Sequence, residues 1–285
     1  MFGILWAQDA DPTIFRTQTR LVVLHATASD KEGHLLMNLP KSAFQIYENG
    51  VRQEIKSFRR EDVPVSLGLI IDSSASMTDK RDRVAAAALA MVQSSNPEDE
   101  VFIVNFAEKP SLDVDFTSDT ARLKKGLARV EPHGQTAMRD AMRTAIEHLK
   151  GRNKKDKKVL MVVTDGNDNS SEASLDSVVR AAQQGEVLIY AVGLFTDETP
   201  HEAERARHAL DALAQATGGQ AYYPADVSEI DRIAPQIAHE IRNQYIVTYS
   251  PANQELDGSF RQIRVLVDSP AVGTVRTRSG YYATP

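Results

Sequence analysis

An apolar run that ends in a cluster of oxygen-bearing side chains constrains this chain more than any other feature. The run Leu67-Gly-Leu-Ile-Ile71 continues as Asp72-Ser73-Ser74-Ala75-Ser76, and a helical pattern follows from Thr78. An apolar run bounded by turn residues is typical of a buried strand. The motif then places one carboxylate and two hydroxyls on alternate residues, just past the carboxyl end of the strand. Because open α/β sheets bind ligands at that edge, we interpret Asp72, Ser74 and Ser76 as one part of a divalent-metal site.

From Pro64 onward the sequence alternates between strand and helix patterns, which predicts a parallel sheet. We expect strands at 65–71, 100–106, 112–116, 159–163, 187–192 and 221–223, and helices at 81–93, 120–130, 137–149, 175–184, 201–217 and 226–242. The fold class is therefore α/β, a doubly wound and mostly parallel sheet. In the doubly wound strand order 3-2-1-4-5-6, the strands that end at Asp72 and Asp165 are neighbours at the point where the order reverses.

Both ends of the chain have strand patterns without helices. We expect strands at 20–27, 44–47, 53–59, 245–249 and 261–267, and a last strand that includes Val275 and Tyr281-Tyr282. The sequence Glu48-Asn49-Gly50 predicts a tight hairpin. Because two or three strands cannot bury a core alone, we expect residues 20–63 and 244–285 to form one small β-sandwich, into which the α/β domain of residues 64–243 is inserted.

Residues 1–19 are predicted to be a tail. Met1 to Ala10 is short, apolar and without basic residues, and two interpretations stay open: the remnant of a trimmed secretory signal, or a frayed terminus. No apolar run approaches the roughly 18 to 20 residues that cross a bilayer, so we expect no integral membrane segment.

Composition excludes several classes of function. The 285 residues carry a net charge of −6, whereas a nucleic-acid-binding protein normally has a basic surface, so we expect no nucleic-acid partner. The absence of cysteine excludes disulfides, thiolate zinc sites and cysteine nucleophiles.

Two further loops of the α/β part carry oxygen donors. Thr136 follows Gly134 in a loop that opens a helix, and Asp165 precedes Gly166 at the end of the valine-rich strand 159–163. With the first loop, this makes a set of hard oxygen donors, which suits Mg²⁺ or Ca²⁺ rather than zinc or copper. Two carboxylates roughly neutralise a dication and three hydroxyls complete its shell, so that a partner's carboxylate can take an exchangeable position.

Asp72-x-Ser74-x-Ser76, Thr136 and Asp165-Gly166 resemble the metal-ion-dependent adhesion site of von Willebrand factor type A domains, over about residues 64–242. The flanking sequences Phe44-Gln-Ile-Tyr-Glu-Asn-Gly and Tyr245-Ile-Val-Thr-Tyr-Ser-Pro are similar to those of bacterial, acidobacterial-type proteins related to this family.

This resemblance implies a non-catalytic adhesion or protein-binding module. It implies one divalent cation, Mg²⁺ or else Ca²⁺ or Mn²⁺, with Asp165 bound through water, and a protein partner that supplies a carboxylate. It also implies export to the periplasm, the medium or the cell surface. The residues that we assign to the rim of the site are Ser73, Gly134, Gly166 and Asp168.

Two alternatives remain open from the residues. One is a Mg²⁺-dependent hydrolase that uses the same ion as a Lewis acid, for which Glu131 and Asp168 are the nearby candidates for a general base. The other is a scaffold whose metal is purely structural. Each loop also has an ordinary explanation when taken alone, since Asp, Ser and Thr favour helix N-caps. The sequence leaves the partner, the choice of cation and the oligomeric state undetermined.

Overall fold

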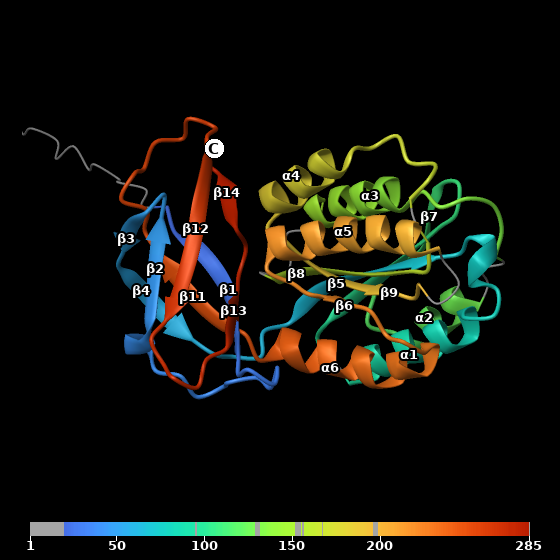
Figure 1. Ribbon diagram of the computed structural model, residues 1–285, viewed down its shortest axis with the longest axis horizontal. Helices are drawn as coiled ribbons and strands as arrows, with labels where there is room; N and C mark the ends of the chain where they lie inside the picture. The colour runs from blue at the N-terminus through green and yellow to red at the C-terminus, as the bar shows by residue number, and fades with distance from the viewer. Residues whose placement is uncertain are drawn as a thin grey trace, which may run out of the picture.

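The computed structural model describes residues 20–94, 96–128, 132–151, 155, 157–166, 168–195 and 199–284, so the predicted tail 1–19 and Glu131 lie outside it. The molecule has two parts that lie side by side, a β-sandwich and an α/β domain (Figure 1).

The α/β domain is built on a six-stranded sheet whose order is β10-β9-β8-β5-β6-β7. Its strands are β5 (Val65–Asp72), β6 (Glu100–Phe106), β7 (Pro110–Thr117), β8 (Lys157–Thr164), β9 (Val187–Gly193) and β10 (Ala221–Tyr222). All neighbours are parallel except β6 and β7. Counted from β5 as the first strand, this is the order 3-2-1-4-5-6, so the predicted topology is confirmed. β5 and β8 are neighbours, with Ile71 opposite Val163.

Helices cover both faces of this sheet (Figure 1). They are α1 (Arg81–Gln93), α2 (Thr120–Ala128), α3 (Met138–Lys150), α4 (Leu175–Gly185), α5 (Pro200–Thr217) and α6 (Ile230–Arg242), with short 3-10 turns η1 (Lys41–Ala43), η2 (Ala75–Met77) and η3 (Val227–Glu229). Helices α1, α2 and α6 lie on one face and α3, α4 and α5 on the other.

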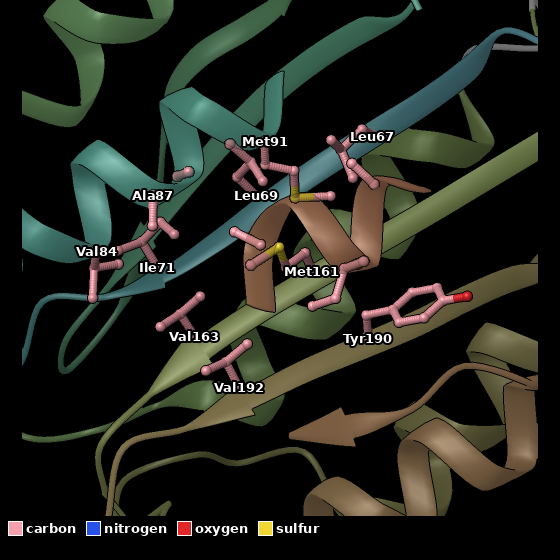
Figure 2. Close-up of a cluster of buried hydrophobic side chains, with 14 of the residues drawn as sticks. Leu67, Leu69, Ile71, Val84, Ala87, Met91, Met161, Val163, Tyr190 and Val192 are labelled. Carbon is pink, nitrogen blue, oxygen red and sulfur yellow. The ribbon is translucent and has the colours of Figure 1, made fainter. Parts of the chain in front are cut away.

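Alternation along β5 explains the two cores. Successive side chains of a strand point to opposite faces of the sheet. Leu69 and Ile71 therefore pack with Val84 of α1 on one face (Figure 2), and Ile70 packs with the other helices on the opposite face. Because both faces are covered, all eight residues of β5 are buried, including Asp72 at its end.

The β-sandwich consists of two four-stranded sheets, β13-β1-β11-β4 and β14-β12-β2-β3. Its strands come from both chain ends, as predicted, and they are β1 (Val22–Ser29), β2 (Phe44–Glu48), β3 (Val51–Gln53), β4 (Ile55–Arg59), β11 (Tyr245–Tyr249), β12 (Phe260–Val267), β13 (Thr274–Arg276) and β14 (Gly280–Tyr282). Their inward side chains form a third core.

Two predicted strands are each divided between the two sheets. The tight turn at Asn49 (φ 48°) and Gly50 (φ 80°) holds β3 against β2, but the chain then crosses at Glu54, and β4 pairs with β11 instead. The predicted last strand is likewise two strands, because β13 pairs with β1 and β14 with β12. Which sheet each strand joins depends on its pairing partner elsewhere in the chain, so the local sequence pattern did not reveal the crossings.

Buried polar contacts fix the sandwich to the α/β domain. Helix α6 runs almost directly into β11, and its Glu240, 3% exposed, forms an ion pair of 2.7 Å with Arg276 of β13. The Tyr190 hydroxyl donates to Glu240 over 2.7 Å, and Arg276 donates to the Gly219 carbonyl over 2.9 Å. The sandwich is therefore docked by groups that lose these partners if it separates.

Candidate metal site

The first loop of the site begins at Asp72, whose carboxylate is 2% exposed at the end of β5. One oxygen accepts the Ser74 backbone N–H at 2.8 Å, and the other accepts the Thr164 hydroxyl at 2.5 Å. The pKa of Asp72 is raised to about 6, chiefly by burial; these hydrogen bonds lower it, and the nearby Asp165 carboxylate adds a smaller increase. A cation beside Asp72 would favour its charged form, because opposite charge stabilises a carboxylate.

The third loop brings Asp165 against the first. The Ser76 hydroxyl donates to Asp165 Oδ1 at 2.8 Å, and Ser76 Oγ lies 3.1 Å from Ser74 Oγ. The Lys80 ammonium donates to Asp165 Oδ2 at 2.7 Å, and the Asp165 side chain is fully buried. Asp72 and Asp165 are thus joined through the two serines in one hydrogen-bonded chain.

The second loop, which carries Thr136, is bound to both others through the backbone. The Thr136 N–H donates to the Asn169 side chain at 3.0 Å, and its carbonyl accepts the Asn169 N–H at 3.1 Å. The second loop also contacts the first. The His133 N–H donates to the Ser73 carbonyl at 2.9 Å, and the Ala75 N–H donates to the Gly134 carbonyl at 3.4 Å. The three loops therefore form one cross-linked unit, in which Thr136 is 4% exposed.

The four residues assigned to the rim lie in these loops. The Ser73 hydroxyl donates to the Phe106 carbonyl at 2.8 Å. Gly134 has φ +69°, and a Cβ there would lie 2.8 Å from the Glu108 side chain. The Gly166 N–H donates to the Thr164 hydroxyl at 3.3 Å.

Asp168, the fourth rim residue, is held by its neighbours. Its carboxylate accepts the Arg139 backbone N–H at 2.7 Å and the Ser171 hydroxyl at 2.7 Å, and it forms an ion pair of 3.1 Å with the Arg139 guanidinium. These bonds join the third loop to the start of α3. They also occupy the carboxylate that the hydrolase alternative would use as a base.

Two residues at the site were not singled out from the sequence: Thr164 and Lys80. Lys80 lies four residues after Ser76. In a helical turn this spacing brings two side chains to the same side, so the sequence could have placed Lys80 near the site. Thr164 directly precedes Asp165, but its bond to Asp72 depends on the pairing of β5 with β8.

The donor chemistry fits a hard divalent cation. Among the described residues, no three His, Cys, Asp or Glu side chains are grouped so that they could hold a metal, and the site offers two carboxylates with hydroxyls instead. Oxygen donors of this kind suit Mg²⁺ or Ca²⁺. The Lys80 ammonium already supplies positive charge at Asp165. Ser76 is exposed, whereas Asp72, Ser74, Thr136 and Asp165 are at most 4% exposed, so the cluster opens to solvent on one side.

A cavity of about 580 Å³ adjoins the site between the start of α3, the third loop and α5. Gly166 and Asp168 line it on the side of the site, and His201, Arg205 and His208 line it on the side of α5. Glu204 also lies in the α5 wall, which therefore carries acidic, basic and titratable groups.

Comparison with known proteins agrees with this architecture. A family model described as the von Willebrand factor type A domain matches residues 67–167. No curated protein sequence matches the chain. Among the described residues, no helix has the length and apolar character that a membrane crossing needs.

Several solved structures share the fold. A von Willebrand factor type A protein from Catenulispora acidiphila has a TM-score of 0.52 at 13% identity, with 94% of this chain and 75% of that chain covered. Proximal thread matrix protein 1 from the mussel byssus, with a zinc-occupied MIDAS motif, has 0.55 at 17%, covering 68% and 49%. The vWF domain of the type V pili tip protein Mfa5 from Porphyromonas gingivalis has 0.50 at 15%, covering 63% and 97%. The chain spans about half the length of the mussel protein.

Proposed function

Because the α/β domain of this chain is a von Willebrand factor type A domain, we propose that it is a metal-dependent protein-binding or adhesion module. Its cation, Mg²⁺ or else Ca²⁺ or Mn²⁺, is held by Asp72, Ser74, Ser76, Thr136 and Asp165, and it takes an acidic side chain of a partner protein as its last ligand. Residues 64–243 form the binding domain, and residues 20–63 with 244–285 form the β-sandwich domain.

One observation carries this proposal. Three loops far apart in the sequence are cross-linked at the end of the sheet away from the sandwich (Figure 1), and hydrogen bonds link Asp72, Ser74, Ser76 and Asp165, of which Ser76 is exposed. Ordinary helix caps do not require such convergence, since each satisfies its own helix.

Charge explains why a carboxylate is the expected ligand. Asp72 and Asp165 contribute two negative charges and Lys80 contributes one positive charge. A bound dication therefore makes the cluster net positive, and an anionic group reaching the open side is attracted.

The site supports recognition better than catalysis. The Asp168 carboxylate is bound by Arg139 and Ser171, and Glu131 lies outside the described residues. No contact in the described structure favours the hydrolase over the binding module. We therefore propose a non-enzymatic role.

The kinds of protein that share this fold support a location outside the cytoplasm. They include a byssus matrix protein, a pili tip protein and a minor pilin from Streptococcus sanguinis. We propose that this chain also acts in the periplasm, in the medium or at a cell surface.

The decisive experiment is capture of partners from the envelope fraction of the source organism on the immobilised chain, with Mg²⁺ or with EDTA. We expect a set of proteins that is retained only with the metal and is lost in Thr136→Ala, which stays folded. Thr120→Ala, at the exposed start of α2, is the matched control and keeps the same partners.

Two outcomes contradict the proposal. A chelator-insensitive partner set excludes capture through the metal. If calorimetry detects Mg²⁺ binding but Thr136→Ala keeps all of its partners, the metal has only a structural role.

A further inference from the structure

A second cavity lies at the other end of the α/β domain, between that domain and the sandwich. It has a volume of about 320 Å³. This is at the lower end of the range of roughly 300–1,000 Å³ that is usual for ligand pockets. The outward face of sheet β13-β1-β11-β4 forms one wall with Val23, His25 and Ile246, and the end of α4 and the start of β9 form the other with Ala182 and Leu188.

Two buried nitrogen atoms at this cavity lack hydrogen-bond partners among the described residues: His25 Nδ1 and Arg278 Nε. Arg278 is 8% exposed, and its other nitrogens donate to Glu186 at 2.8 Å and to the Val23 carbonyl at 2.9 Å. Buried polar groups in folded proteins are nearly always paired. Both of these atoms are closed to solvent, so a ligand in the cavity would reach them only after neighbouring side chains move.

The charges around the cavity are mainly positive. Burial lowers the pKa of His25 well below its usual value, and Lys157, Arg278 and Arg59 lower it further. His25 is therefore neutral, and the cationic side chains that line the cavity with it are those of Arg59 and Arg278. The acidic groups that face them are Glu186, which pairs with Arg278, and Glu61, which approaches Arg59 only to 3.9 Å on the exposed rim.

We propose that this cavity binds a small organic carboxylate with an apolar body. The carboxylate lies beside the side chains of Arg59 and Arg278, and the body packs on Val23 and Ile246. The apolar part of the lining favours such a ligand over a bare inorganic anion, since a fully hydrated ion gains nothing from contact with aliphatic walls.

This site is separate from the proposed metal centre. It lies at the amino ends of β8 and β9, where Lys157 and Val187 begin those strands, whereas the metal loops follow the carboxyl ends. Its ligand would contact both domains, because residues of the sandwich and of the α/β domain form opposite walls. Binding there would add contacts across the docking interface.

The test is calorimetric titration of the whole chain with sodium benzoate, at fixed ionic strength and with EDTA present. Benzamide, which has the same shape without the charge, and inorganic phosphate, which has the charge without the apolar body, are the comparison ligands. We expect benzoate to bind with a dissociation constant of about 1 mM or below, and both comparison ligands to bind at least about tenfold more weakly.

Variants separate this site from the rest of the surface. Arg59→Gln removes one charged contact without touching the Arg278 contacts that dock the domains, and we expect about a tenfold loss of benzoate affinity. Val23→Trp fills the cavity from a partly exposed position and abolishes binding. Arg52→Gln, an exposed arginine on β3 outside the cavity, is the matched control and leaves the affinity unchanged.

The proposal is overturned by absence of benzoate binding up to about 10 mM. Equal affinity for benzamide also overturns it, because the charge then plays no part, and so does an unchanged affinity in a folded Arg59→Gln. If inorganic phosphate binds more tightly than benzoate, the apolar part of the ligand does not contribute to affinity, and the proposed ligand class is wrong.

Discussion

Replacing Lys80 by methionine should strengthen metal binding while weakening the metal-free fold. The ammonium lies 2.7 Å from Asp165 Oδ2, and the two side chains are 10% and 0% exposed. Methionine keeps the apolar stem and the volume but removes the charge. In the metal-free protein, this leaves the Asp165 carboxylate buried next to Asp72 without its cation.

The magnitude follows from the geometry. Two unit charges about 4 Å apart attract by about 4 kcal/mol at an effective permittivity of about 20. Desolvation of the ammonium offsets part of this, and removing one partner of a buried pair usually costs about 3–5 kcal/mol. We expect Lys80→Met to lower the metal-free free energy of unfolding by about 3 kcal/mol. A bound dication takes over the neutralisation of Asp165, so the loaded protein avoids this cost, and Mg²⁺ affinity rises by about two orders of magnitude.

The assay combines urea unfolding in EDTA with calorimetric titration of Mg²⁺. Lys124→Met, at an exposed lysine of α2, serves as the matched control and should change neither quantity. If Lys80→Met has wild-type stability in EDTA and wild-type Mg²⁺ affinity, the ammonium does not compete with the metal. Weaker Mg²⁺ binding would instead make Lys80 a residue that builds the site.

Three further substitutions test other parts of the structure. Gly134 and Gly33 both have positive φ, but only Gly134 has a side chain in the way of a Cβ. Alanine at either position should lower the unfolding free energy by about 1–2 kcal/mol because of the left-handed backbone, and only Gly134→Ala should weaken Mg²⁺ binding in calorimetry. Glu240 pairs with a buried guanidinium, whereas Glu98 belongs to an exposed pair. In urea titration, Glu240→Gln should lower the unfolding free energy by about 3–5 kcal/mol, and Glu98→Gln should change it by about 0.5 kcal/mol. Burial lowers the pKa of Lys157 from 10.5 to about 7, so between these values the unfolded chain holds a proton that the folded chain has lost. Stability should therefore rise by about 2–3 kcal/mol between about pH 7 and 9. Lys157→Met should remove that rise, and an equal slope in both proteins would refute the assignment.

The periodicity of the sequence was enough to predict the fold because most elements agree with their local pattern. Helix α1 and strand β6 have the predicted bounds, and β5 is the buried run that ends at Asp72. The doubly wound order followed from alternation of strands and helices, since few arrangements of such a chain bury both faces of a sheet.

What the sequence left out depends on contacts between distant segments. Strand β4 lies in a different sheet from β3 because it pairs with β11. Strand β11 follows the whole inserted domain in the sequence, and no local signal encodes this pairing. The Thr164 contact with Asp72 and the Lys80 contact with Asp165 likewise exist only once β5 and β8 are neighbours. The donor types were identified from the sequence, whereas the contact of the Lys80 ammonium with Asp165 was not.

The insertion of one domain into the other also has a mechanical consequence. The two halves of the sandwich are joined by four ladders: β1 with β11, β1 with β13, β4 with β11 and β2 with β12. Tension applied between residues 20 and 284 is borne first by those ladders. The inserted domain is stretched only after they rupture, so its loops keep their shape under a pull that already strains the sandwich.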